Sequence, residues 1–250
     1  MILYSAESGI ARITLNRPEK RNALDPESIR ELKNALARAA EDAEVRVVAI
    51  TGAGDDFCSG ADLASLDRTA EAGVLDHIET ARSLAEVFLQ IRHHPRPIVA
   101  LVRGRALAGG CGLATACDLI VAAEAARFGY PEVNIGFVPA MVMAILRRST
   151  TEKRAFELLT TGEIITAPQA HAIGLINRVY PDGEFDPSAG EYLAALASKS
   201  ASAVSLSKNL LYHMDGMTFD AAIEAGVHAN ALARMTEDAR RGIERVIRKS

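Results

Sequence analysis

The stretch from Pro97 to Ile120 constrains the fold more than any other part of the chain. It begins with a short apolar run rich in β-branched residues, Ile98–Val102, which predicts a buried strand. A glycine-bearing run of small residues with helical potential follows at Ala108–Asp118, and a second apolar run at Leu119–Ala123 predicts another strand. Two buried strands joined through a helix indicate layered α/β architecture.

Three glycines, Gly109, Gly110 and Gly112, lie where the first of these strands passes into the helix. Glycine lets a ligand approach the backbone closely, and the free N–H groups of a helix start lie at the positive end of its dipole. Such a place can hold an oxygen that becomes anionic during a reaction. The alternative is tight packing of the helix on the sheet. A second glycine-bearing turn at Phe57–Leu63 favours the ligand-binding interpretation.

Apolar periodicity and turn signals predict the rest of the α/β core. Further strands are expected at residues 11–15, 45–50 and 174–180, and helices from Pro26, over 66–90, over 141–148, over 153–160 and from Thr166. Residues 181–190 are expected to form a linker. The sequence therefore predicts a core over residues 1–190 and a helical region over residues 191–250, which either mediates oligomerisation or caps the core.

Composition excludes several classes of function. The net charge of −4 argues against nucleic acid as a partner. The first residues lack the pattern of a signal peptide, and no apolar run reaches membrane-spanning length. The three cysteines lack zinc-ligand spacing, so no metal is expected and a reducing, cytoplasmic location fits best. Fingerprints of a nucleophile elbow, a dinucleotide site and a triphosphate-binding loop are all missing from the sequence.

Several motifs occur in the order found in one enzyme family. They are Ile13–Pro18 with Asn22–Leu24, Phe57–Leu63, Ala108–Cys111 with Ala116–Asp118, Phe128–Glu132, Thr161–Gly162, Gly174–Asn177 and Ser207–Leu210. Together they resemble the crotonase (enoyl-CoA hydratase/isomerase) superfamily over nearly the whole chain. The resemblance implies an α/β spiral of repeated ββα units, a C-terminal helical region that forms trimer contacts and covers the coenzyme A site, and an acyl-CoA thioester as the ligand. It implies a homotrimer or hexamer, and no cofactor beyond the coenzyme A of the substrate.

The resemblance also assigns roles to residues of the two glycine-bearing turns. The amides of Ala61 and Gly109 match the family's oxyanion hole, in agreement with the interpretation of the turns themselves. The remaining substrate-binding positions are expected at Ser59, Asp62, Leu63, Gly110 and Gly112. Arg21, next to Lys20, either meets the phosphates of coenzyme A or lies in an ordinary solvated turn.

Glu132 lies in an irregular segment between Pro131 and apolar residues, where it is either a surface charge or a partly desolvated acid or base. It matches a catalytic glutamate of the family, which favours the second interpretation. Typical hydratases carry another glutamate at the position of Gly112, and the sequence departs from them there. Residues 138–143 are also apolar where many hydratases have a glycine-rich helix start.

A single carboxylate is sufficient for a double-bond isomerase, and it also serves a hydratase if it both deprotonates water and returns the proton. The family base rate favours hydration of a 2-enoyl-CoA with Glu132 as acid/base. The alternatives are a Δ3,Δ2-enoyl-CoA isomerase with Glu132 as the sole base, and a catalytically weak acyl-CoA-binding protein.

Overall fold

The computed structural model describes residues 1–68 and 71–248. A sheet of six strands in the order β1-β2-β3-β4-β6-β9 forms the centre of the fold. β1 pairs with β2 in antiparallel fashion, and the other neighbours are parallel. The bounds are β1 (Ile2–Glu7), β2 (Ile10–Leu15), β3 (Val47–Gly52), β4 (Ile98–Val102), β6 (Leu119–Ala123) and β9 (Arg178–Tyr180).

Three short strands form a second, smaller sheet. It contains β5 (Arg105–Leu107), β7 (Arg127–Gly129) and β8 (Ile164–Thr166). A parallel bridge between Cys58 and Ala106 extends it toward the segment that follows β3. The chain thus repeats one order of elements: a strand of the large sheet, a short strand or bridge of the small sheet, and a helix. This is the ββα repeat that the resemblance implies.

Three helices of the core begin at a residue whose side chain caps them. Asp25 Oδ1, for example, accepts a hydrogen bond of 2.8 Å from the Ser28 amide at the start of α1. The core helices are α1 (Pro26–Glu41), α2 (Leu63–Arg68), α3 (Val74–His93), α4 (Gly109–Ala116), α5 (Ala140–Ser149), α6 (Glu152–Thr161), α7 (Ala167–Ala172) and α8 (Phe185–Ala197). Short 3-10 helices occupy η1 (Pro18–Lys20), η2 (Pro131–Ile135) and η3 (Asp182–Glu184).

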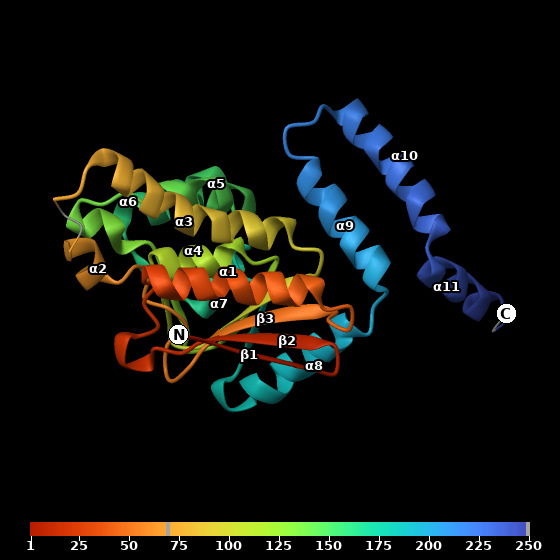
Figure 1. Cartoon of the computed structure of the whole chain (residues 1–250), viewed down its shortest axis with the longest axis horizontal. Coiled ribbons are helices and arrows are strands. Elements are labelled where there is room, and N and C mark those ends of the chain that lie inside the picture. The colour runs from red at the N-terminus through yellow and green to blue at the C-terminus, as the bar shows by residue number, and fades with distance from the viewer. Residues whose placement is uncertain (69–70, 249–250) are drawn as a thin grey trace.

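The central strands are buried on both faces, because helices cover the large sheet on each side. In β3, Val48 and Ile50 belong to the main core cluster, whereas Val47 and Ala49 face a separate cluster formed with α8. Figure 1 shows α8 on one side of the strands, and α1, α3 and α4 on the other. This double cover explains why the predicted strands read as continuous apolar runs.

Two expectations differ from the structure in the second half of the chain. The strand expected at 174–180 is limited to β9, because residues 174–177 form the turn after α7. The linker expected at 181–190 is instead η3 and the first part of α8, whose Phe185 and Ala189 are buried against the sheet. In the first half, the one helix expected over 66–90 is instead two helices, α2 and α3, and residues 69–70 between them lie outside the described residues.

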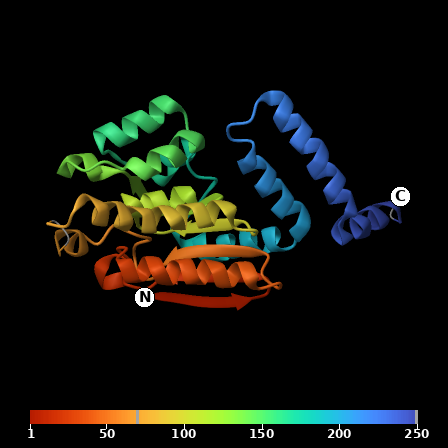
Figure 2. The ribbon, with the colours of Figure 1, turned by 45° about the horizontal axis from the view of Figure 1, so that its top comes forward.

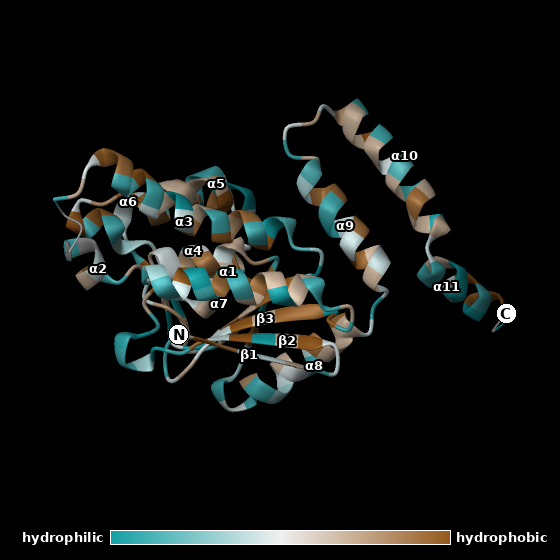
Figure 3. Ribbon diagram, in the orientation of Figure 1, coloured by the Kyte–Doolittle hydropathy of each residue, from teal (hydrophilic) through white to brown (hydrophobic). Residues whose placement is uncertain are grey.

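Beyond α8, three helices leave the core, as Figures 1 and 2 show. We call α9 (Ala201–His213), α10 (Phe219–Met235) and α11 (Glu237–Ile247) the C-terminal arm. Apolar and polar segments alternate along it in Figure 3. Many of its large apolar side chains are exposed, among them Leu211, Phe219, Ile223, Val227, Leu232 and Met235. Within the described part of the chain, no helix is long and apolar enough to cross a membrane.

A buried ion pair fastens the arm to the core. Lys208 Nζ on α9 lies 2.7 Å from Asp118 Oδ2 and donates to the carbonyl oxygens of Ile91 and Arg96. Tyr212 Oη donates to the other oxygen of Asp118 at 2.6 Å. These contacts fix the direction in which α9 departs, because the buried ammonium finds its acceptors only in this position.

Candidate functional site

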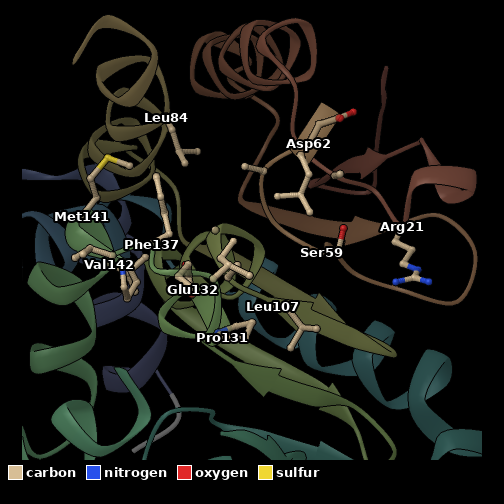
Figure 4. Close-up of a pocket in the computed structure, with 18 of the residues that line it drawn as sticks. Arg21, Ser59, Asp62, Leu84, Leu107, Pro131, Glu132, Phe137, Met141 and Val142 are labelled. Atoms are coloured by element: carbon tan, nitrogen blue, oxygen red, sulfur yellow. The ribbon is translucent and has the colours of Figure 1, made fainter. Parts of the chain in front are cut away.

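A cavity of about 750 Å³ opens between the two glycine-bearing turns and the segment that carries Glu132. Figure 4 shows Glu132, Met141 and Val142 on one side of it, and Arg21 and Ser59 on the other. Of the residues predicted for the site, the lining includes Arg21, Ser59, Ala61, Asp62, Leu63, Gly109 and Glu132. The lining lies between residues 19 and 142, so none of the residues described in the C-terminal arm contributes to it.

The first turn holds the amide of Ala61 toward the cavity. The residues on either side of Ala61 both bond to Leu24. The Leu24 N–H donates to the Gly60 carbonyl at 2.7 Å, and the Leu24 carbonyl accepts from the Asp62 amide at 2.9 Å. Gly60 has a φ of 98°, which a side chain would strain. The Ala61 amide itself donates to no other residue in the described ranges.

The second turn presents the amide of Gly109, the first residue of α4. Ala108 precedes it with a φ of 50°, an uncommon conformation for a residue with a side chain. A Cβ built on Gly109 would lie 3.8 Å from the Ala61 nitrogen, so the two turns meet closely. Like that of Ala61, the Gly109 amide has no acceptor among the described residues. The two N–H groups therefore remain available for a ligand oxygen.

Gly110 and Gly112 do not line the cavity. A Cβ on Gly110 would lie 2.3 Å from the carbonyl oxygen of Cys58, so this glycine serves the close approach of α4 to the neighbouring strand. A Cβ on Gly112 would lie 2.6 Å from Val142 Cγ2 and 3.4 Å from Phe88 Cζ. Val142 thus fills the place that a side chain at residue 112 would need.

Glu132 is the titratable group in the apolar part of the cavity. It lies on η2, and its Oε2 is buried without a hydrogen-bond partner in the described part of the chain. Burial raises the pKa of this carboxyl above its ordinary value. A half-buried acid whose Oε2 has no partner among the described residues is suited to accept and release a proton.

The segment before Glu132 is anchored in the core. Tyr130 is fully buried, and its hydroxyl lies 2.7 Å from Thr115 Oγ1 on α4. The same helix α4 supplies the Gly109 amide at its first turn. Helix α4 therefore connects the segment that carries Glu132 to one of the two amide donors.

The polar residues near the first turn differ in what they offer a ligand. The Asp62 carboxylate already accepts from Arg17 Nη2 and from the amides of Ala64 and Ser65, which it caps. The hydrogen bond from Arg17 lowers the pKa of Asp62. Arg21, in contrast, is exposed at the rim beside Lys20. Asp62 thus shapes the turn through bonds within the protein, whereas Arg21 remains open to an anionic ligand.

Sequence reasoning identified only one part of the apolar wall of the cavity, the run at residues 138–143. Leu84 and Phe88 of α3, with Phe137, Met141 and Val142 around the start of α5, form this wall. Leu84 and Phe88 fit the apolar stripe of a helix, and that pattern does not separate a core position from a cavity wall. The apolar run at 138–143 was a signal of this wall, because a helix start that is exposed to water does not need apolar residues.

The arrangement suits chemistry on a carbonyl compound. Two free backbone donors lie close together, a carboxyl with a raised pKa lies in the same cavity, and the wall beside them is apolar. Such donors stabilise charge that develops on a carbonyl oxygen. Among the residues that the structure describes, no cluster of His, Cys, Asp or Glu side chains could hold a metal ion.

Comparisons with known proteins agree with this chemistry. Residues 5–249 match the family model described as "Enoyl-CoA hydratase/isomerase". A Thermus thermophilus protein named "Putative enoyl-CoA hydratase" is 42% identical over 99% of this chain and 98% of its own length. The crotonyl-CoA hydratase of Syntrophomonas wolfei is 33% identical over 99% of this chain and 95% of its own. The crystal structure of human enoyl Coenzyme A hydratase domain-containing protein 3 superposes with a TM-score of 0.94 at 32% identity, covering 99% of this chain and 97% of that one.

Proposed function

The chain belongs to the enoyl-CoA hydratase/isomerase family, and from this premise we propose that it hydrates a 2-enoyl-CoA thioester. The observation that carries the proposal is the unpartnered, buried Oε2 of Glu132 in one cavity with the free amides of Ala61 and Gly109. The names of the similar proteins support hydration as the reaction.

In the proposed reaction, the thioester oxygen accepts hydrogen bonds from the amides of Ala61 and Gly109. The Glu132 carboxylate removes a proton from water, whose oxygen forms a bond to C3 while the C2–C3 double bond becomes an enolate. The two amides stabilise the enolate oxygen. Glu132, now protonated, then transfers its proton to C2, and the carboxylate is restored.

A second candidate is Δ3,Δ2-enoyl-CoA isomerisation, favoured by the contact of Val142 with the Cα region of Gly112. Because Val142 occupies the space beside Gly112, no second carboxylate holds water there. Glu132 alone would remove a proton from C2 of a 3-enoyl thioester and return it to C4 on the same face. The same two amides would hold the intermediate enolate.

The rim of the cavity supports an assignment for the coenzyme A part of the ligand, and the C-terminal arm supports one for contacts between copies of the chain. We assign the phosphates of coenzyme A to Arg21 and Lys20, the exposed cations of the lining. The substrate supplies the coenzyme A, and the proposal requires no further cofactor. The exposed apolar side chains of the C-terminal arm support contacts with further copies of the chain, as a trimer or hexamer. A cytoplasmic location stays a prediction from the sequence.

A panel of thioesters tests the proposed function. Crotonyl-CoA and longer 2-enoyl-CoA thioesters would be followed for loss of the conjugated enoyl absorbance, and 3-enoyl-CoA thioesters for its appearance. Faster hydration than isomerisation is the expected result. The reverse order would establish the isomerase. Tight binding of the thioesters without either reaction would contradict both and leave an acyl-CoA-binding protein.

A further inference from the structure

The guanidinium of Arg17 connects three segments beneath the first glycine-bearing turn. Its Nη2 donates to Asp62 Oδ2 at 2.9 Å, and its Nη1 donates to the Ala23 carbonyl at 2.8 Å. Nη1 also lies 3.0 Å from Asp25 Oδ2. The side chains of Arg17, Asp25 and Asp62 expose only 18%, 24% and 12% of their surface. Charge-assisted bonds of this kind, shielded from water, hold geometry more firmly than surface ion pairs.

The loop that contains Arg17 is itself tightly constrained. Arg21 and Asn22 follow one another with φ values of 51° and 55°, which side chains seldom adopt. Asn22 is 2% exposed, and its Nδ2 donates to the carbonyls of Ala53 and Asp56. Its Oδ1 accepts from the Arg17 amide at 2.9 Å. Strained backbone of this kind persists only where surrounding bonds fix it, and it concentrates at functional sites.

This loop is the surface on which the first turn rests. Leu24 bonds to both residues that flank Ala61, and the Ser59 amide donates to the Arg21 carbonyl at 3.0 Å. The direction of the Ala61 N–H is therefore set by the position of residues 21–24 relative to residues 59–62. Arg17 is the side chain that joins these two segments, since it bonds to Ala23 in one and to Asp62 in the other.

We infer that Arg17 is a positioning residue for the reaction: by bridging Ala23 and Asp62, it holds the Ala61 amide at the thioester oxygen. The inference rests on the proposed function, because it assigns Ala61 to the oxyanion hole. Arg17 does not itself line the cavity. A preorganised donor loses its effect on the transition state when it moves by a fraction of a bond length, so a distant support can control turnover.

The two carboxylates that pair with the Arg17 guanidinium provide a matched pair of variants. Asp62→Asn keeps the oxygen that caps α2 but loses the bond to Arg17, whereas Asp25→Asn keeps the oxygen that caps α1 and loses the other ion pair. Arg17→Met removes the bridge while keeping much of the length of the side chain. Each variant would be compared with the wild-type protein in steady-state kinetics and in thermal unfolding.

The direct readout is the spectrum of a bound thioester. A conjugated aryl-enoyl-CoA absorbs at longer wavelength when hydrogen bonds polarise its carbonyl, so the shift on binding reports the two amides without turnover. We expect Arg17→Met and Asp62→Asn to lose most of this shift and to lower kcat by roughly 10- to 100-fold with KM almost unchanged. Asp25→Asn is expected to retain the shift and the turnover.

The inference is overturned if folded Arg17→Met and Asp62→Asn keep the wild-type shift and kcat, or if Asp25→Asn loses as much as Asp62→Asn. Should Arg17→Met fail to fold, the comparison of the two asparagine variants decides by itself. Failure of the proposed function has a different signature: the wild-type protein then binds the aryl-enoyl-CoA without any shift.

Discussion

The two sides of the cavity are built from different parts of the chain. On the amide side, comprising residues 59–62 and 107–110, the proposed reacting groups are backbone N–H groups held by hydrogen bonds and by close packing between turns. On the acid side, residues 131–142, the proposed reacting group is the side chain of Glu132 beside exposed Ile135, Phe137 and Val138. The proposed donors are thus main-chain atoms of turns that neighbouring segments hold in place, whereas the proposed acid/base lies on an exposed segment.

The difference bears on how each side tolerates substitution. On the amide side a change of one atom meets backbone, as at Gly110, where a Cβ would approach the Cys58 carbonyl to 2.3 Å. On the acid side a Cβ built on Gly136 has nothing within 4 Å, so only its φ of 74° would resist a side chain. We therefore expect substitutions on the amide side to change folding and catalysis together unless they point into the cavity, and those on the acid side to change catalysis alone.

The largest effect is expected from Glu132→Gln. Gln keeps the shape of the side chain but cannot transfer a proton, so kcat should fall by about 10²- to 10⁴-fold while the affinity for a CoA thioester is retained. Steady-state kinetics and thioester binding measure the two quantities. Glu19→Gln, the same change at another carboxylate of the lining, serves as the control. Retention of most of the wild-type kcat would show that Glu132 is not the base.

Gly109→Val tests whether the amide side separates folding from catalysis. A Cβ at Gly109 meets its neighbours at an ordinary 3.8 Å, so the variant should fold, yet the branched side chain obstructs the thioester oxygen. We expect a loss of about 10²- to 10³-fold in kcat with little change in Tm. Gly110→Ala, one residue away, should instead lower stability by about 1–3 kcal/mol through overpacking. Equal loss of Tm in both variants would contradict the distinction.

A double variant, Gly112→Glu with Val142→Ala, tests whether the lack of a second carboxylate on the acid side limits hydration. Gly112→Glu alone meets Val142 Cγ2, so the second substitution makes room for the new carboxylate. A second acid could hold water while Glu132 serves C2, and we expect the ratio of hydration to isomerisation to rise up to about 100-fold. Gly112→Gln with Val142→Ala is the matched control without the charge. An unchanged ratio in a folded double variant would show that the missing carboxylate does not limit hydration.

The raised pKa of Glu132 predicts a dependence of activity and stability on pH. Because the ionised form is the base, kcat/KM should rise with pH through a midpoint above the ordinary 4.5. Folding stability should run in the opposite direction: between the ordinary and the raised pKa the folded chain binds more protons than the unfolded chain, so stability falls as pH rises. Glu132→Gln removes that fall. The Tm of the variant should therefore exceed that of the wild type by a margin that grows with pH, up to a few degrees.

The smallest effect is expected from Tyr130→Phe, which removes the hydroxyl that anchors the acid side to α4. Thr115 Oγ1 retains its bond to the Cys111 carbonyl, so no buried hydroxyl is orphaned. Denaturant unfolding should show a loss of about 0.5–1.5 kcal/mol, with only a slight fall in turnover. A large fall in kcat at unchanged stability would instead make Tyr130 a positioning residue for Glu132.

Much of the fold was predictable because it depends on local patterns. The strands at 98–102 and 119–123 were bounded correctly, since apolar runs between turn signals are characteristic of strands buried on both faces. The helix from Pro26 began where Asp25 caps it. The small sheet was not predicted, because β5, β7 and β8 are too short for any periodicity to register. Residues 185–190, the first part of α8, were expected to be linker because glycine and proline there are typical of one.

The sequence by itself determined which groups were available: two glycine-bearing turns, the glutamate after Pro131, and no second carboxylate at residue 112. The tertiary structure alone decided which of them meet. The free amides of Ala61 and Gly109 come together because the Leu24 and Cys58 bridges align distant segments, and Glu132 remains unpartnered because an apolar wall surrounds it. Hydrogen bonds and contacts between residues far apart in the chain have no local signature, and for that reason the roles of Arg17 and Val142 emerged only from the three-dimensional arrangement.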